Sequence, residues 1–334
     1  FNPELECARE AARMLSLPTA LEVASFAHGQ AELVTFKIPK NNKLDGMKLW
    51  DLNKSIPSDV ETNVVICAVE RGDEVHIPSG NFQLQCGDEV SFVSTRKIAR
   101  KFLRSIGFKT RQVRSAMIVG GGRSSYYLAQ ELLGMGIEVK IIEKNRERCE
   151  ELCELLPDAN IINGDGTSEA LLREEGIEYA ESFVALTGID EENILLTLHA
   201  RNVSNAKVIT KINRINFRNA INTLDLGSVL YPKYITAEAI VAYARAKHNS
   251  MNSNVETLNY ICENRVEAVE FRVNEASAAT GTMLKDLKPR MKKDILIASI
   301  NRGGKILIPS GVDTIEVGDT VMVVTTHSGF NDIL

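Results

Sequence analysis

The segment Ala116-Met-Ile-Val-Gly-Gly-Gly-Arg-Ser-Ser125 decides the fold of the middle of this chain. A short apolar run stops at a glycine cluster, and a helical pattern follows at once, as in the strand, tight turn and helix of a dinucleotide-binding unit. Gly120 would permit the tight turn, and Gly122 would let the backbone approach a diphosphate. The amides at the start of the helix would then face that anion. Ser125 replaces the third glycine of G-x-G-x-x-G, so a turn that only packs helix against strand is the alternative.

Strand and helix patterns alternate between residues 114 and 230. We expect strands at 117–119, 138–142, 160–162, 183–186 and 207–212, and helices at about 124–135, 146–156, 168–175, 190–201 and 216–224. This alternation predicts a parallel sheet covered on both faces, whose right-handed crossovers bring the carboxyl ends of the strands to one edge. Ligands of such sheets bind at that edge, where the strand order reverses.

Small or polar residues follow every predicted strand. They are the glycine cluster, Glu143, Gly164-Asp165-Gly166-Thr167, Thr187-Gly188-Ile-Asp190 and Lys211-Ile-Asn213-Arg214. Glu143 can accept hydrogen bonds from the ribose hydroxyls of an adenosine, and Asp165 can reach an adenine or a ribose. Any one of these loops is weak evidence because loops are usually polar, but together at one sheet edge they predict a nucleotide site.

The chain also carries an internal repeat. One set of three motifs occurs twice, and each motif returns the same number of residues further along the chain. The first copy is Arg71-Gly72, Ile77-Pro-Ser-Gly80 and Gly87-Asp88, and the second is Arg302-Gly303, Ile308-Pro-Ser-Gly311 and Gly318-Asp319. Each copy reads as short strands joined by turns, which predicts a small α+β module. The segment from Asn2 resembles the segment from Tyr231, and both look like an amphipathic helix that enters a module. We therefore expect another dinucleotide-type domain before Phe1.

Composition and missing motifs narrow the function. Charged residues make up 25% and the net charge is −5, which gives no support to nucleic-acid binding. No apolar run approaches the roughly 18 residues of a membrane span. The six cysteines form no C-x-x-C pair, as expected for reduced thiols in a cytoplasmic protein. The sequence contains no P-loop, G-x-S-x-G, H-E-x-x-H or ordered Ser/His/Asp set, so we expect binding rather than catalysis, with an NAD-dependent oxidoreductase as the alternative.

These motifs resemble a known family. Gly120-Gly-Gly-Arg123, Ile142-Glu143, Gly164-Asp-Gly-Thr167, Ala185-Leu-Thr187 and Asp190-Glu-x-Asn193 look like the N-lobe, or KTN domain, of RCK (regulator of potassium conductance) proteins. The repeated modules resemble the RCK C-lobe, also called TrkA-C. The fold class is then α/β, a Rossmann-like parallel sheet domain flanked by two small α+β TrkA-C modules. The tandem order resembles the TrkA family of NAD-binding peripheral subunits of the Trk potassium uptake system, with single-unit RCK channel or Ktr proteins as the alternative.

The resemblance divides the chain into six parts. We expect a crossover helix region left from a preceding N-lobe at 1–30, a first TrkA-C module at 31–95 and a basic linker helix at 96–113. The RCK N-lobe would follow at 114–230, then a second crossover helix at 231–266 and a second TrkA-C module at 267–334. The helices near 3–15 and 235–246 would form dimer crossovers or pack within one domain. The basic stretch at 96–114 would contact an anionic membrane face or an acidic partner, or its apolar stripe would pack on a neighbouring domain.

The resemblance also implies a ligand, NAD(H), with ATP or ADP as further ligands of the same site. Its binding residues would be Gly120, Gly121, Gly122, Arg123, Ser124, Glu143, Gly164, Asp165, Thr187, Gly188 and Lys211. The residues from Gly120 to Ser124 would hold the diphosphate, Glu143 the ribose, and Lys211 would approach a phosphate. No catalytic residue and no metal site is implied. Ser124-Ser125 stands where the family usually has an aliphatic residue and then glycine, so Ser125 would narrow the pocket or weaken the binding of the diphosphate.

The function implied by the resemblance is nucleotide-sensing regulation. The chain would be a cytoplasmic subunit, peripheral on the inner face of the cell membrane, that gates a TrkH-like potassium channel subunit. It would self-associate into a gating ring, and ligand occupancy would favour one hinge angle between lobes. A structural ring with a vestigial site is the alternative.

Overall fold

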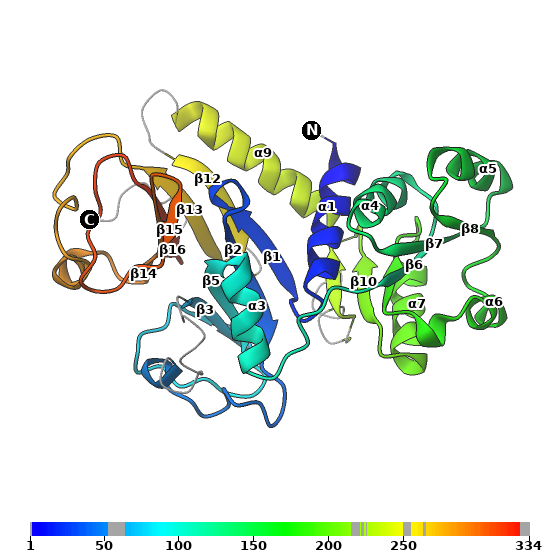
Figure 1. The fold of residues 1–334 in the computed structure, drawn as a ribbon, viewed down its shortest axis with the longest axis horizontal. Helices are drawn as coiled ribbons and strands as arrows, with labels where there is room; N and C mark the ends of the chain where they lie inside the picture. The colour runs from blue at the N-terminus through cyan, green and yellow to red at the C-terminus, as the bar shows by residue number, and fades with distance from the viewer. Residues whose placement is uncertain are drawn as a thin grey trace. The chain divides into compact units, whose positions relative to one another are not determined.

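The computed structural model describes residues 2–52, 64–214, 221, 224, 226–249, 255–262 and 265–327. The chain divides into two compact units, each built from two separate stretches (Figure 1). Unit 1 comprises Phe1–Leu21 and Arg111–Ala239, and unit 2 comprises Glu22–Thr110 and Ile240–Leu334. The chain therefore passes between the units after Leu21, after Thr110 and within helix α9 (Pro232–Asn249). Over the described residues, no helix combines the length and hydropathy that a bilayer crossing needs.

A parallel six-stranded sheet forms the centre of unit 1, in the order β11-β10-β9-β6-β7-β8. Its strands are β6 (Ser115–Val119), β7 (Glu138–Glu143), β8 (Asn160–Asn163), β9 (Ser182–Ala185), β10 (Lys207–Lys211) and β11 (Ser228–Leu230). The order reverses between β6 and β9, as in doubly wound folds. The predicted parallel sheet is confirmed. The sixth strand, β11, was not predicted because three residues are too few to show a pattern.

Alternate residues of the strands face two separate apolar cores of unit 1. Ala116 and Ile118 of β6 pack with residues of α1 (Pro3–Ser16), α4 (Arg123–Gly134) and α5 (Arg146–Leu155). Met117 and Val119 pack with residues of α6 (Glu169–Glu174), η3 (Ile177–Tyr179) and α7 (Asp190–Val203). Helices thus cover both faces of the sheet, which explains why its strands are nearly continuous apolar runs. The helix predicted at 216–224 falls almost wholly outside the described residues.

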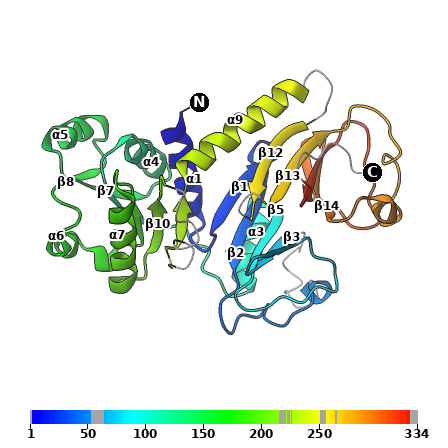
Figure 2. The same cartoon turned by 180° about the vertical axis from the view of Figure 1, so that it is seen from behind.

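Helix α1 belongs to unit 1 although it starts the chain, and Figure 2 shows it beside α4. Its first residue is a proline, and the Asn2 side chain accepts a hydrogen bond of 3.1 Å from the Leu5 amide, which caps the helix. Its buried face carries mostly alanine and other small residues, which lets it approach α4 closely. Asn2 also donates to the Tyr127 hydroxyl at 3.0 Å. The helix expected near 3–15 therefore packs on the sheet domain through α4.

Unit 2 contains two antiparallel five-stranded sheets with equivalent strand orders, β1-β2-β5-β3-β4 and β12-β13-β16-β14-β15. The first sheet has β1 (Glu22–Phe26), β2 (Ala31–Lys37), β3 (Val65–Arg71), β4 (Glu74–His76) and β5 (Glu89–Thr95). The second has β12 (Val255–Ile261), β13 (Val266–Arg272), β14 (Ile295–Arg302), β15 (Lys305–Leu307) and β16 (Thr320–Thr325). One apolar core, with Leu33 and Val93 from one sheet and Ala268 and Val324 from the other, joins the two.

Short helices complete unit 2. They are η1 (Ala27–Gly29), η2 (Leu49–Asp51), α3 (Arg96–Ser105), α10 (Leu284–Leu287) and η4 (Lys288–Arg290). Phe102 of α3 is buried and makes edge-on ring contacts with Phe36 and Phe92 of the first sheet. The apolar stripe predicted in the basic stretch thus packs on its own module, and the basic side chains are left on the other face of α3.

The repeated arginine and aspartate residues bind each other in both modules. Arg71 donates to the two carboxylate oxygens of Asp88 at 2.7 and 2.8 Å, and Arg302 donates to those of Asp319 at 2.9 and 2.8 Å. Both aspartates are buried, with 1% of their surface exposed. Burial alone would raise the pKa of Asp319, but hydrogen bonds from Arg302 and the Glu316 amide hold that pKa below its usual value. The sequence repeat therefore preserves a buried ion pair as well as turns.

Candidate nucleotide-binding site

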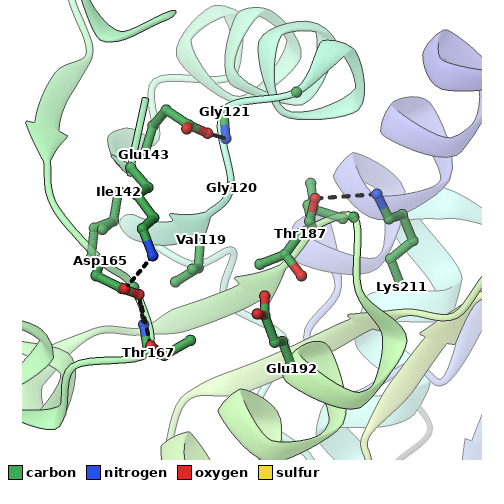
Figure 3. Close-up of a pocket in the computed structure, with 15 residues that line it drawn as sticks. Val119, Gly120, Gly121, Ile142, Glu143, Asp165, Thr167, Thr187, Glu192 and Lys211 are labelled. Atoms are coloured by element: carbon green, nitrogen blue, oxygen red, sulfur yellow. Dashed lines mark hydrogen bonds and ion pairs between the residues drawn. The ribbon is translucent and has the colours of Figure 1, made fainter. Parts of the chain in front are cut away.

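A cavity of about 470 Å³ opens at the carboxyl ends of the strands of unit 1, where the strand order reverses (Figure 3). This is the edge at which ligands of doubly wound sheets bind. The lining residues come from the loops after β6, β7, β8 and β9, from the start of α7 and from the end of β10. They are Val119, Gly120, Gly121, Gly122, Ile142, Glu143, Lys144, Asp165, Gly166, Thr167, Leu186, Thr187, Gly188, Glu192 and Lys211.

The glycine loop forms one wall of the cavity, and its three glycines are needed for two physical reasons. Gly120 has φ +99°, and a Cβ there would lie 2.9 Å from the Leu186 carbonyl oxygen. A Cβ on Gly121 would lie 2.9 Å from the Glu143 side chain. Gly122 caps α4, and a Cβ there would meet nothing within 4 Å. The first two glycines therefore allow close chain approach, and the third leaves open space before the helix N-terminus, where unpaired amides face outward.

Glu143 points at the glycine loop from the end of β7, as Figure 3 shows. Its Oε2 accepts the Gly121 amide at 2.6 Å, and its Oε1 accepts the Asn145 amide at 2.7 Å. Each carboxylate oxygen offers about two acceptor sites, so both oxygens keep capacity for a hydroxyl donor. The carboxylate is thus fixed by backbone groups at the place where a ribose diol would be recognised.

Asp165 lies at the same end of the cavity, after β8. Its carboxylate accepts the Thr167 amide at 3.0 Å and the Thr167 hydroxyl at 2.7 Å, and it accepts the Lys144 ammonium at 2.7 Å. The hydrogen bond from Lys144, followed by those from Thr167, holds the pKa of Asp165 well below its usual range. Asp165 therefore stays an anion with a fixed orientation, while the exposed Lys144 reduces the negative potential beside Glu143.

The opposite wall is organised by Asn193, a fully buried residue of α7. Its Oδ1 accepts the Thr187 amide at 2.8 Å, and its Nδ2 donates to the carbonyls of Thr187 and Lys211 at 3.2 and 2.9 Å. One side chain thus ties the loop after β9 to the end of β10. Lys211 donates to the Leu186 carbonyl at 3.2 Å, and burial lowers the pKa of the Lys211 ammonium. Lys211 thereby lines the cavity from the end of β10.

The cavity contains eight of the eleven candidate residues. It brings together Gly120, Gly121, Gly122, Glu143, Asp165, Thr187, Gly188 and Lys211. Gly164 lies behind the wall, where its amide donates to the Glu143 carbonyl at 2.9 Å. Arg123 and Ser124 are the first two residues of α4, and neither is among the described residues that line the cavity.

Several lining residues were not among the candidates, namely Val119, Ile142, Lys144, Gly166, Thr167, Leu186 and Glu192. Gly166 and Thr167 belong to the loop already noted after the third strand, so that loop was the available signal. Asn193 had a signal as well, since it closes the Asp190-Glu-x-Asn193 motif. Nothing in the sequence pattern distinguishes Glu192 from the other acidic residues at the start of α7.

Ser125 does not line the cavity. It is fully buried in the first turn of α4, and its hydroxyl has no hydrogen-bond partner among the described residues. Its side chain therefore fills space inside unit 1, where the glycine of the common motif would let helix and strand come closer. The expected narrowing of the pocket by Ser125 is not seen in the lining residues.

Comparison with known proteins extends the geometric findings. The TrkA-N domain family matches residues 116–232, and the TrkA-C domain family matches residues 33–107 and 268–334. The Trk system potassium uptake protein TrkA homolog of Archaeoglobus fulgidus is 32% identical over 321 residues, covering 96% of this chain and 69% of that protein. The GsuK RCK domain has a TM-score of 0.53 at 17% identity, covering 96% of this chain and 67% of that chain. The GsuK channel bound to NAD has a TM-score of 0.52 at 17% identity, with coverages of 94% and 54%.

Proposed function

Because this chain belongs to the family of TrkA proteins of the Trk potassium uptake system, we propose that it is a nucleotide-sensing regulatory subunit that gates a membrane potassium channel. One observation carries the proposal. A cavity at the reversal of a parallel sheet has a glycine loop on one side and a backbone-fixed carboxylate, Glu143, facing it. A TrkA-N domain with such a cavity stands between two TrkA-C domains in one chain.

The proposed ligand is NAD(H), with ATP and ADP as further ligands of the same cavity. The residues present fit such a molecule, because Gly122 leaves open space at the α4 N-terminus, where a diphosphate would lie. Glu143 would accept the adenosine ribose hydroxyls, and its charge would repel the 2′-phosphate of NADP. The other candidates would also serve the nucleotide. Arg123 and Ser124 would hold the diphosphate through backbone amides, Gly164 would support the loop after β8, and Asp165, Thr187, Gly188 and Lys211 would line the cavity. The NAD-bound GsuK channel, which shares the fold, supports this choice.

We propose that the ligand is bound and released unchanged, so that the chain is not an enzyme. The names of its relatives, which describe potassium uptake, support this reading. The oxidoreductase alternative makes a separate prediction, consumption of NADH in the presence of a substrate. Incubation of the protein with NADH and candidate carbonyl substrates tests it through absorbance, and steady turnover would refute the regulatory reading.

The proposed mechanism is a ligand-dependent rearrangement between lobes. A ligand shifts such an equilibrium only by binding one arrangement more tightly than the other. We propose that 114–230 is the N-lobe and that 31–95 and 267–334 are C-lobe modules. The segments 1–30 and 231–266 would be crossover helix regions, and 96–113 would be a basic linker helix. The chain would self-associate into a ring on the cytoplasmic face of the membrane and act on a TrkH-like channel subunit. Nucleic acid would not be among its partners.

Calorimetric titration with NADH, NAD, ATP and ADP tests the site directly. We expect saturable binding, and we expect Glu143→Gln to weaken NAD binding by roughly tenfold or more, because an amide cannot replace a charged acceptor of several donors. Glu138→Gln, at the exposed opposite end of β7, is the matched control and should bind as the wild type does. Absence of binding by the wild type would favour a structural ring with a vestigial site.

A further inference from the structure

Two side chains hold Gly121 of the glycine loop from opposite ends of the residue. The Glu143 carboxylate accepts its amide at 2.6 Å, and Arg148 donates from Nε to its carbonyl oxygen at 2.7 Å. Arg148 stands in the first turn of α5, and its Nη1 also pairs with Glu151 at 2.6 Å. Glu143 was predicted from the sequence as a ribose ligand, and Arg148 was not predicted to have any role.

The contact from Arg148 determines where the next amide points. In a trans peptide the carbonyl of one residue and the N–H of the next point in opposite directions. The Gly121 carbonyl faces Arg148, which does not line the cavity, so the Gly122 N–H points away from Arg148. Gly122 itself lines the cavity, and no residue in the described part of the chain accepts its amide. An amide that is fixed in direction and unpaired is suited to an anionic ligand.

We propose that Arg148 is a positioning residue for the diphosphate of the ligand, which deepens the proposed function and rests on it. Arg148 holds the Gly121–Gly122 peptide so that the Gly122 amide and the α4 N-terminus face the same anion. The planar guanidinium suits this task because it binds the loop carbonyl and Glu151 simultaneously in fixed directions. Without it, the glycine-rich peptide can rotate, and ordering that peptide on binding costs free energy.

The test compares ligands with and without a diphosphate. We expect Arg148→Met to weaken the binding of NAD and ADP by roughly tenfold or more, the effect of losing a charge-assisted hydrogen bond. Binding of adenosine, which lacks phosphate, should stay within about twofold of the wild type, since the mutation leaves both Glu143 contacts intact. Arg146→Met is the matched control, because Arg146 lies in the same helical turn and pairs only on the surface with Glu150. It should bind all three ligands as the wild type does.

A second measurement covers the case in which adenosine binds too weakly for calorimetry. In protein labelled with ¹⁵N-glycine, ADP should shift the Gly122 amide resonance strongly in the wild type and Arg146→Met, and weakly in Arg148→Met at equal saturation. Two results for Arg148→Met would overturn the positioning role. One is an equal loss of affinity for adenosine and for ADP, and the other is an ADP-induced shift of the Gly122 resonance as large as that of the wild type at saturation. If the wild type binds neither NAD nor ADP, the proposed function fails instead, so the two failures are distinguishable.

Discussion

At the residue scale, the glycine loop separates two reasons for glycine. Gly120 and Gly136 both have positive φ, +99° and +73°, which L side chains rarely adopt. A Cβ on Gly120 would lie 2.9 Å from backbone atoms of Leu186, while a Cβ on Gly136 would meet nothing within 4 Å. Conformational strain is therefore common to both positions, and steric conflict with the neighbouring loop belongs to Gly120 alone.

This difference predicts unequal effects of alanine. Gly136→Ala should lower the free energy of unfolding by about 1–2 kcal/mol through strain and leave NAD affinity unchanged. Gly120→Ala should cost about 1–3 kcal/mol more, because Leu186 must move, and it should weaken NAD binding at least tenfold. Urea unfolding and calorimetry measure the two effects. Equal losses of stability and equal affinities for the two variants would contradict the role given to Gly120.

Lys207 offers a pH-dependent prediction at the same scale. Its ammonium donates to the Ala20 carbonyl at 2.6 Å and to the Ser228 hydroxyl at 2.8 Å inside unit 1. Burial, and to a smaller extent Arg201, lower the pKa of Lys207 to about 8. In the unfolded chain the lysine pKa is about 10.4. Between these values the unfolded chain binds more protons, so this residue makes the free energy of unfolding rise with pH.

We expect Lys207→Met to remove that rise. Between about pH 8 and pH 10, the stability of the wild type should gain about 1 kcal/mol per pH unit relative to the variant. The wild type must be compared with Lys207→Met at each pH, because Cys7 has an opposite effect in both proteins. Burial raises the pKa of Cys7 to about 12, so this thiol makes the free energy of unfolding fall with pH above the pKa of the unfolded thiol. Urea unfolding at several pH values measures the difference. A constant difference across this range would contradict the prediction.

At the scale of elements, each TrkA-C module is a repeat of contacts as well as of sequence. The sheet register shifts at Ile66/Ala68 in the first module and at Ile297/Ser299 in the second, which are equivalent positions. The arginine at the end of β3 or β14 then binds the buried aspartate before β5 or β16. The bulge and the ion pair therefore form one conserved arrangement within this chain.

The buried pair predicts a large cost of substitution in both modules. Asp88→Asn and Asp319→Asn should each lower the free energy of unfolding by about 1.5–3 kcal/mol, because the buried aspartate loses its charge-assisted hydrogen bonds from a partly exposed arginine. Glu89→Gln, which removes only an exposed pair with Lys37, should cost less than about 1 kcal/mol. Urea unfolding compares them. Since the pKa of Asp319 is lowered, its contribution should disappear as pH falls below about 4. A small effect of both aspartate variants would contradict this account.

At the scale of the whole molecule, two units have separate cores, and the proposed ligand site lies wholly in unit 1. A ligand that binds only the folded state stabilises the unit that carries its site. At 100 times its Kd, NAD should stabilise unit 1 by about 2.7 kcal/mol. Hydrogen exchange should therefore slow in β6 and β7 more than in β2 and β5. Uniform protection of both units would contradict a site confined to unit 1.

The sequence by itself determined the parallel sheet, its edge and most residues of the cavity. Glycine clusters and polar residues after apolar runs are local signals, and parallel strands place their carboxyl ends together whatever the details of packing. The repeat likewise indicated two modules of one kind. These conclusions depend on order and spacing along the chain, which the sequence states directly.

Only the tertiary structure decided which side chains hold the site in place. The contacts of Arg148 with Gly121, and of Asn193 with Thr187 and Lys211, join elements whose relative orientation sequence spacing does not fix. The same holds for α1, which packs on a sheet domain that starts about a hundred residues later. Side-chain direction depends on packing between elements, so hydrogen bonds between distant loops emerge only once the chain is folded.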